Sequence, residues 1–346
     1  MATFWASIFV FGILIFFHEL GHFAVAKAVG IKVHEFSLGF GPRLLGIARG
    51  ETNYNLRLFP LGGFVRMAGM DPEEVEVERG KGFGDKTVLQ RVSVIVAGPI
   101  MNFFLAILLL AVIFMFQGYP SPSTTIKSLL PGEPAEIAGI KAGDKIDMIN
   151  HKKMNSWEDI TKTINSHPGE KIDVLVIREG RPVEITVVPK AGEGGRGLIG
   201  IMPEQQMKRL NPLAAIATGF SFTVKVTVLI ISFIGKMITG QAPADLGGPV
   251  RVIWEIDRAV QTGIFYLLQL AAFLSINLGL FNLLPIPALD GSRIMFLGVE
   301  GLRGRPVDPA KENFIHIVGF GFLLLLIVFI TYNDILQLFI QNPQAP

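Results

Sequence analysis

Four long apolar stretches without Asp, Glu, Lys or Arg decide what this chain can fold into. They cover residues 2–17, 92–124, 259–289 and 313–330. A helix needs about 20 apolar residues to cross the hydrocarbon core of a bilayer. Half of the residues are hydrophobic, only 17% are charged and the mean hydropathy is +0.48, which is too apolar for a soluble protein of this length. The sequence therefore predicts a polytopic α-helical membrane protein with about four transmembrane helices, over 1–30, 92–118, 259–290 and 313–333.

Lysine and arginine are distributed unevenly over the connecting segments. None occurs in the first 26 residues and none follows Lys311, whereas 27–91 and 291–312 are rich in both. In membrane proteins the short cytoplasmic loops carry the excess of positive charge. We therefore predict that the loop 31–91 and the link 291–312 are cytoplasmic, and that both termini and the long segment 122–204 lie on the opposite side.

Residues 207–258 are harder to place, because the apolar run 211–240 inside them is interrupted by Lys225 and Lys236. A further span there would leave the basic link that precedes the last apolar stretch outside, against the charge bias. Long lysine side chains reach water from a helix that lies in the membrane interface. We predict that 207–258 is an interfacial amphipathic segment.

The first apolar stretch ends in three ionisable side chains, His18, Glu19 and His22, in the sequence HELGH. A charged group at membrane depth costs about 2.5 to 3.5 kcal/mol on insertion scales and usually serves a function. Residues four apart share one face of a helix, so both imidazoles can bind one metal ion. HExxH is the zincin pattern, in which two histidines bind zinc and the glutamate is the base toward an activated water. We predict a zinc site with Glu19 as the catalytic base.

A catalytic zinc needs a third protein ligand. Glu35 and Glu51 are candidates, but both lie in the polar loop after the first helix. Asp290 directly follows an apolar stretch, after two prolines and before Gly291, where a broken helix lets a carboxylate turn inward. An aspartate at such a place can also be a simple helix N-cap. Because HELGH lacks one ligand on the same side of the membrane, we predict Asp290.

In these motifs the chain resembles the site-2 proteases, which are intramembrane zinc metalloproteases, and specifically their bacterial RseP-like branch with a single PDZ domain. The shared motifs are HELGH at 18–22, GPIMN at 98–102 and NLLPIPALDG at 282–291. The zinc ligands that the resemblance implies are His18, His22 and Asp290. It also implies that Glu19 is catalytic and that Asn102 and Asn282 help to hold substrate or intermediate. From the residues alone, Asn102 can instead bond to a neighbouring helix.

The chain departs from the family pattern directly after Asp290, and it has one further histidine in an apolar stretch. The family usually continues Asp-Gly-Gly-His, whereas this chain has Ser292 and Arg293 after its Asp-Gly pair. Serine is small, so we expect it to allow the turn. His316, in the last apolar stretch, is expected to pack or to lie at the interface rather than to bind metal.

The segment 52–67, TNYNLRLFPLGGFVRM, alternates polar and apolar residues and then turns at Pro60. This period predicts a membrane-associated β-hairpin. A helical substrate must unwind before hydrolysis, and a strand edge can hold an extended peptide by strand addition. The predicted substrate-binding residues of this hairpin are Asn53, Asn55 and Arg57. An ordinary hairpin packed under the helices is the alternative.

Residues 122–204 are predicted to form a separate α+β domain. IDVLVIREG and PVEITVVPK predict a β-hairpin, and SWEDITKTINS predicts an amphipathic helix. The order of short helix, Gly-Asp turn and strand resembles a PDZ domain. The loop that this resemblance implies for a peptide carboxylate is Leu198, Ile199, Gly200 and Ile201. A domain that only excludes bulky ectodomains is the other reading.

Motifs and resemblance together predict an intramembrane zinc endopeptidase of the bacterial inner membrane, with its active site near the cytoplasmic side. The resemblance implies substrates with one transmembrane helix, such as anti-sigma factors or signal-peptide remnants, and an upstream site-1 protease. The competing hypothesis is a non-catalytic membrane scaffold that recruits partners through its PDZ domain. The net charge of +2 gives no indication of nucleic-acid binding, and the absence of cysteine excludes thiolate zinc ligands.

Overall fold

The computed structural model describes residues 1–70, 77–243 and 247–341. The chain divides into two compact units. The membrane unit comprises Met1–Ile113 and Asn211–Pro346, and the inserted unit comprises Phe114–Leu210. Parts of the predicted cytoplasmic loop and of the predicted interfacial segment, at 71–76 and 244–246, lie outside the described residues.

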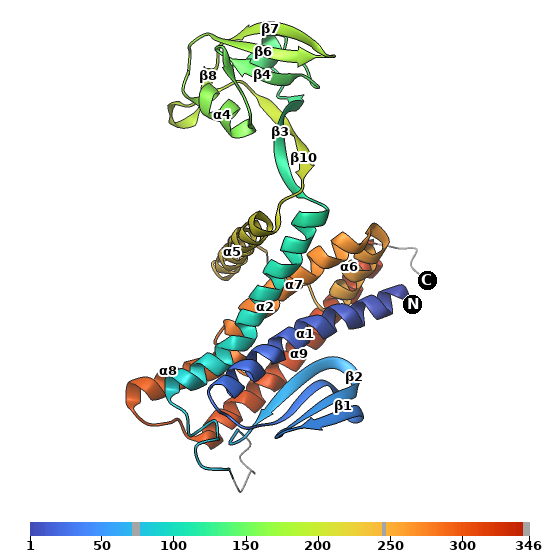
Figure 1. Ribbon diagram of the computed structural model, residues 1–346, viewed down its shortest axis with the longest axis vertical. Helices are drawn as coiled ribbons and strands as arrows, with labels where there is room; N and C mark the ends of the chain where they lie inside the picture. Colours follow the sequence, from blue (N-terminus) through green and yellow to red (C-terminus); the bar gives the residue numbers. More distant parts are fainter. Residues whose placement is uncertain (71–76, 244–246, 342–346) are drawn as a thin grey trace. The chain divides into compact units, whose positions relative to one another are not determined.

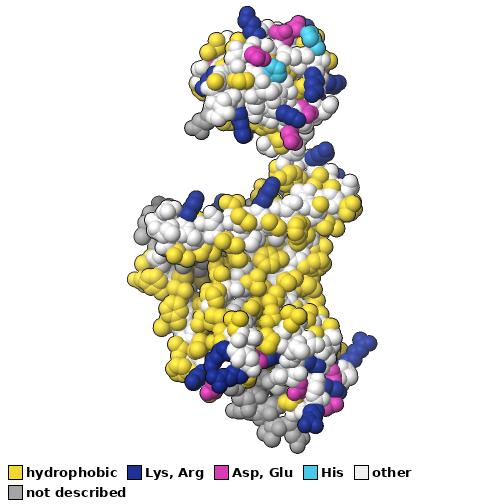
Figure 2. Space-filling model, turned by 90° about the vertical axis from the view of Figure 1, so that its left-hand side faces the viewer, with side chains coloured by type: hydrophobic (Ala, Val, Ile, Leu, Met, Phe, Trp, Pro, Cys, Tyr) yellow, Lys and Arg dark blue, Asp and Glu magenta, His cyan; other side chains and the backbone are white. Residues whose placement is uncertain are grey.

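Five helices among the described residues are long and apolar enough to cross a membrane. They are α1 (Ala2–Ala28), α2 (Val88–Phe116), α5 (Pro212–Ile238), α7 (Ile264–Leu283) and α9 (Pro309–Gln341). Figure 2 shows the matching surface, a broad band of hydrophobic side chains across the membrane unit, with charged side chains gathered at one end of it. The prediction of several long apolar helices is therefore confirmed, and their number, length and composition fit a membrane protein.

Helix α5 is the one helix that meets these criteria beyond the four expected, and it covers the apolar run that we predicted to be interfacial. Its 27 residues correspond to a length of about 40 Å at 1.5 Å per residue. Figure 1 shows α5 almost end-on, whereas α1, α2 and α9 run along the plane of the picture. Helix α5 therefore crosses α1, α2 and α9 steeply.

The third predicted span is shorter than expected. Gly263, at φ +132°, separates the amphipathic helix α6 (Pro249–Thr262) from α7, because this backbone conformation favours glycine. After Leu283 the chain leaves the helix through the two prolines of the PIP sequence and begins α8 (Asp290–Arg303). Asp290 therefore opens a new helix and does not end the apolar one.

The strands β1 (Val33–Arg49) and β2 (Thr52–Met67) form a small antiparallel sheet, but not the predicted hairpin. Residues 33–38 lie at its centre, with Phe36 opposite both Tyr54 and Val65. The two halves of 52–67 therefore pair with β1 and not with each other, and the hairpin prediction is wrong in this respect. Among the described strands none pairs with the outer side of residues 63–67, which form a free edge of the sheet.

The inserted unit is an α+β domain built on a sheet of strand order β10-β3-β4-β6-β7, with β5 beside β4 and a separate β8–β9 pair. The apolar face of α4 packs into the hydrophobic core of this unit with Ile160 and Ile164. Ser156 caps α4 in a capping box with Asp159, as the SWED sequence predicts. The elements are β3 (Tyr119–Leu129), α3 (Pro134–Ile137), β4 (Lys145–Ile149), β5 (Lys152–Lys153), α4 (Trp157–Asn165), β6 (Ile172–Arg178), β7 (Arg181–Val187), β8 (Lys190–Ala191), β9 (Gly197–Leu198) and β10 (Ile201–Lys208).

Candidate active site

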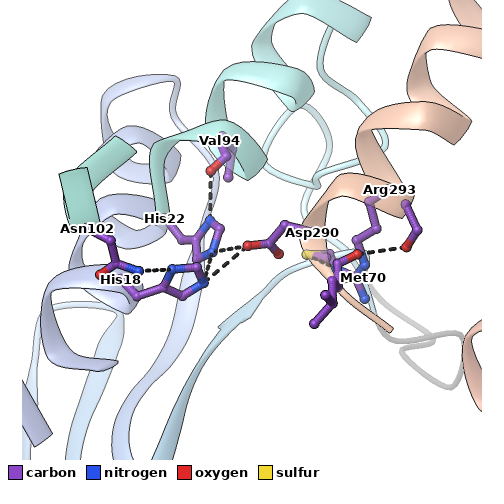
Figure 3. Close-up of polar contacts among 9 residues, drawn as sticks. His18, His22, Met70, Val94, Asn102, Asp290 and Arg293 are labelled. Carbon is purple, nitrogen blue, oxygen red and sulfur yellow. Dashed lines mark hydrogen bonds and ion pairs between the residues drawn. The ribbon is translucent and has the colours of Figure 1, made fainter. Parts of the chain in front are cut away.

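Three side chains that could hold a metal ion converge inside the membrane unit, as Figure 3 shows. Asp290 Oδ2 lies 3.1 Å from His18 Nε2 and 3.3 Å from His22 Nε2, and the two Nε2 atoms are 3.2 Å apart. Ligand atoms about 2.0 to 2.2 Å from a tetrahedral zinc lie roughly 3.3 Å from each other. The three donors therefore have the mutual spacing that a single zinc ion requires. Asp290 Oδ2 is also buried without a hydrogen-bond partner, as expected for an atom that binds a cation.

Helix α2 orients both imidazoles. The Nδ1 of His22 lies 2.8 Å from the backbone oxygen of Val94, so Nδ1–H donates to that carbonyl and Nε2 keeps its lone pair for a metal. The side-chain amide of Asn102 lies 3.1 Å from His18 Nδ1, while its Oδ1 is buried without a partner. Rotating this amide by 180° makes Oδ1 the acceptor of a proton on Nδ1, which again leaves Nε2 free. The surroundings of both rings fit zinc binding.

Glycines bring α1 and α2 into this close contact. A β-carbon at Gly21 would lie 2.3 Å from the backbone oxygen of Ala97, and one at Gly98 would lie 2.3 Å from His22 Nε2. Real β-carbons do not approach other atoms so closely, so the backbone contact requires glycine at position 21, and a side chain at position 98 would displace the His22 ring. The two glycine-containing motifs therefore serve the same purpose, which is to place α2 directly behind the histidines.

The turn that carries Asp290 is equally compact. A β-carbon at Gly291 would lie 2.0 Å from the oxygen of Leu284, so a side chain has no room there. Ser292 is fully buried and its hydroxyl donates to the oxygen of Leu289 at 2.7 Å. The expectation that serine allows the turn is confirmed, and its hydroxyl adds a bond that a glycine lacks.

Glu19 lies beside these donors in a cavity of about 710 Å³. The cavity walls come from α1, from residues 64–67 of the sheet edge, from the start of α8 and from α9. Glu19 is largely buried and is not one of the three converging donors. A carboxylate in this position can accept a proton next to the metal site without occupying a ligand position.

The model of the peptidase family M50, the site-2 proteases, matches residues 6–326. The chain belongs to peptidase family M50. This M50 protease is 36% identical to the zinc metalloprotease RasP of Geobacillus kaustophilus over 96% of its own length and 97% of that protein. It is 37% identical to the regulator of sigma-W protease RasP of Bacillus subtilis, over 97% and 98% of the two chains. A solved PDZ domain of the SdrC-like protein from Listeria innocua matches 25% of the chain and 99% of that domain, at 23% identity and a TM-score of 0.22.

These relationships confirm the predicted enzyme class and cofactor. The protein is a zinc metalloprotease of the site-2 type, and Zn²⁺ is its metal. The competing hypothesis of a non-catalytic scaffold is not supported, because the family consists of proteases and this chain keeps both HELGH and a third donor in place.

The structure places the predicted substrate-binding residues of the sheet away from the cavity wall, and their role toward substrate stays a prediction. Asn55 donates to Glu35 Oε1 at 2.7 Å and Arg57 pairs with the same carboxylate. Burial works to raise the pKa of Glu35, but hydrogen bonds from Ser37, Arg57 and Asn55 outweigh it and hold this pKa below its ordinary value. The cluster is thus an ion pair inside the sheet. Together with Asn53, these side chains are absent from the cavity wall among the described residues.

The part of the sheet that does line the cavity is its free edge. Phe64, Val65, Arg66 and Met67 line the cavity next to Glu19. A β-carbon at Gly63 would lie 3.2 Å from Glu19 Cγ, so this glycine lets the edge approach α1. The Gly-Gly pair before Phe64 was the sequence signal for this approach.

The two predicted asparagines differ in their surroundings. Asn102 is fully buried and its side-chain amide contacts His18 Nδ1, and its predicted role toward substrate stays a prediction. Asn282 is buried near the end of α7, outside the cavity wall, and makes no side-chain hydrogen bond to the described part of the chain. Its substrate role stays a prediction. His316, which we expected to pack or to lie at the interface, lines the cavity.

The predicted PDZ loop lies at a groove of the inserted unit. Leu198, Ile199, Gly200 and Ile201 line a cavity of about 260 Å³ together with Trp157 of α4. Gly200 has φ +76°, and a β-carbon there would lie 2.2 Å from Glu133 Cβ, so this loop position requires glycine. The grouping of loop and helix agrees with the prediction, while peptide binding itself stays a prediction.

Gly98→Ala should weaken zinc binding, because the added methyl group would overlap His22 Nε2 and displace the ring. Loss of a group that orients a metal ligand typically costs about 10- to 100-fold in affinity, and we expect a loss in this range. Zinc content after equilibration with zinc buffers measures it. Gly12→Ala, on α1 with nothing within 4 Å of the added carbon, is the matched control. Equal zinc retention by the two variants would contradict the assigned role of Gly98.

Proposed function

We propose that this protease cleaves single-span membrane proteins within or next to the bilayer, with zinc held by His18, His22 and Asp290 and with Glu19 as general base. The mutual spacing of the three donors, 3.1 to 3.3 Å, carries the proposal. Zinc, when bound, makes water a nucleophile at neutral pH and polarises a peptide carbonyl. Glu19 accepts the proton from the attacking water and can return it to the leaving amine. The test is a cleavage assay on a single-span substrate with wild-type protein and the Glu19→Gln variant.

The substrate is proposed to bind in extended form along the free edge at residues 63–67. This edge lines the same cavity as Glu19 and has unpaired backbone groups on its outer side, which suit strand addition. A helical segment hides its amides in its own hydrogen bonds, so pairing with the edge also keeps the cleaved segment unwound.

A cross-linking experiment tests this binding mode in a chain that has no cysteine. We expect Arg66→Cys to form a disulfide with a cysteine placed near the scissile bond of the substrate. Ile47→Cys, on the opposite edge of the same sheet, should not react with it, and serves as the control. The mode would be wrong if position 47 cross-linked as well as position 66.

The exposed tip of the sheet is proposed to dip into the membrane. Phe40 and Phe59, which lie opposite each other at this end of the sheet, are 48% and 57% exposed. Apolar patches of this kind mark contacts with membrane or protein. Placement of the tip in lipid would hold the edge strand at the depth of the zinc site.

The proposed substrates are anti-sigma factors or signal-peptide remnants with one transmembrane helix, trimmed first by a site-1 protease. The name of the Bacillus subtilis relative, regulator of sigma-W protease, supports the first class. The inserted unit is proposed to act as a PDZ domain that excludes bulky ectodomains, with peptide binding at 198–201 as a second role.

The proposed location is the bacterial inner membrane, with both termini and the PDZ domain outside and the zinc site near the cytoplasmic side. Helices α1, α2, α7 and α9 are the proposed spans. The steep crossing of α5 and its Lys225 and Lys236 support an interfacial position for that helix.

Cysteine labelling in intact cells tests this topology. A membrane-impermeant maleimide should react with Asn150→Cys in the inserted unit and should react with Gly80→Cys only after the membrane is opened. The reverse pattern would invert the topology. Reaction at both positions before opening would place the loop 31–91 outside.

A further inference from the structure

The turn before Asp290 contains a strained residue. Ala288 has φ +73°, and it is the only non-glycine residue with positive φ among the described residues of the membrane unit. A side chain in this region contacts its own backbone closely, and such conformations persist only where the surroundings enforce them. Because Ala288 lies two residues before Asp290, whatever enforces its conformation also sets the direction of the carboxylate.

Helix α9 supplies this constraint through His316. The backbone N–H of Ala288 donates to His316 Nδ1 at 3.2 Å. The ring packs edge-on against Phe296 of α8, with centroids 5.9 Å apart. One turn further along α9, a β-carbon at Gly319 would lie 2.1 Å from Pro287 Cβ, so the helix is pressed against the same turn.

These contacts stand out because α9 is the least buried of the five apolar helices. His316 is also the only ionisable residue of its apolar stretch 313–330, and such groups are costly in a membrane unless they serve a function. The metal cluster among the described residues comprises His18, His22 and Asp290 without His316. Its contribution is therefore the contact with the turn.

We propose that His316 is a positioning residue for zinc: its Nδ1 holds the Ala288 turn in the conformation that directs Asp290 toward the two histidines. The inference rests on the proposed ligand set. It assigns to the last helix a direct role at the metal site, exerted through one hydrogen bond to the backbone. The other ring nitrogen, Nε2, lies 3.7 Å from Glu312 and has no part in this role.

Three substitutions at one position test the proposal. His316→Asn keeps an acceptor near the Nδ1 position, His316→Gln places its polar group near the Nε2 position, and His316→Leu removes both. The readout is the rate at which purified protein loses zinc to a strong chelator. We expect the Leu and Gln variants to lose zinc about 10- to 100-fold faster than wild type, as is typical when a group that orients a ligand is lost. The Asn variant should stay close to wild type.

Glu312→Gln is the matched control, since it changes the neighbour of Nε2 and leaves the bond to Ala288 intact; it should retain zinc like wild type. Should the Leu variant fail to fold, the comparison of Asn with Gln still decides, because both are polar and close in size. Zinc loss at the wild-type rate in the Gln variant overturns the proposal. Slow zinc loss in the Gln variant together with fast zinc loss in the Asn variant also overturns the proposal, since the role would then belong to Nε2.

Asp290→Asn in the same chelator assay separates this inference from the proposed function. If that variant loses zinc rapidly and the Gln and Leu variants at position 316 do not, only the role of His316 fails. If Asp290→Asn holds zinc like wild type, the ligand set itself is wrong.

Discussion

Glu19→Gln is expected to retain one zinc ion and to lose cleavage of a single-span substrate by about 100- to 10,000-fold, the usual contribution of a general base. Glutamine has almost the same shape as glutamate but cannot accept a proton from water. Glu19 lines the cavity next to the three donors without being one of them, so its loss should leave the metal in place. Metal analysis and a cleavage assay on the same preparation measure the two effects.

Glu51→Gln is the matched control for this experiment. Glu51 is on the surface and pairs with Lys27 at 2.6 Å, away from the cavity wall. The Glu51→Gln variant should cleave the substrate at the wild-type rate. Turnover by the Glu19→Gln variant at the level of this control would remove Glu19 from its role, whereas loss of zinc from it would show that Glu19 is part of the metal site.

Asp290→Asn should lower zinc affinity by at least about 100-fold, more than the loss usually seen when only an orienting partner is removed. The amide keeps the shape of the carboxylate but removes the negative charge that lies 3.1 and 3.3 Å from the two imidazole nitrogens. Equilibrium zinc competition against a chelator of known affinity is the measurement. Two ligands that remain on one helix cannot enclose a tetrahedral ion.

Glu35 and Glu51, the other two candidates for the third zinc ligand, are expected to behave differently from Asp290. Glu35 is held in its ion pair with Arg57, and Glu51 in its pair with Lys27. Glu51→Gln should therefore keep its zinc. A larger loss from Glu51→Gln than from Asp290→Asn would exclude Asp290 as a ligand.

The cluster of three candidate ligands could be predicted from the sequence because its signal is local. The spacing of His18 and His22 places them on one helix face whatever the rest of the chain does. Asp290 could be found because an ionisable group at membrane depth costs free energy and therefore usually has a function. The glycines beside them were harder to interpret, since the need for glycine at position 98 comes from His22, on another helix.

The sheet could not be predicted correctly because strand pairing is not local. The 52–67 segment has the period and the turn of a hairpin, and nothing within it shows that both halves pair with residues 33–38. The same segment predicts substrate-binding roles for Asn55 and Arg57, and nothing within it indicates that Glu35 bonds to both. The edge that lines the cavity, residues 63–67, follows only from the observed register.

The position of helix α5 relative to the membrane was equally difficult to predict, because two sequence rules give opposite answers for it. Helix α5 satisfies the length and composition of a span, while the distribution of lysine and arginine argues against one more crossing. His316 illustrates the opposite case. The rule that led to HELGH, that an ionisable group in an apolar helix has a function, applied to it as well, but the partner of His316 is a backbone amide, which has no signature in sequence.

The glycine contact between α1 and α2 also limits the direction from which a peptide can arrive. With Gly21 against Ala97 and Gly98 against His22, no polypeptide can pass between these two helices. The other walls of the cavity come from the sheet edge, from the start of α8 and from α9, which is the least buried of the five apolar helices. We therefore expect a transmembrane segment that diffuses in the bilayer to approach the proposed zinc site along α9, and a bulky lipid-facing substitution on that helix should then slow capture of substrate without altering the chemistry.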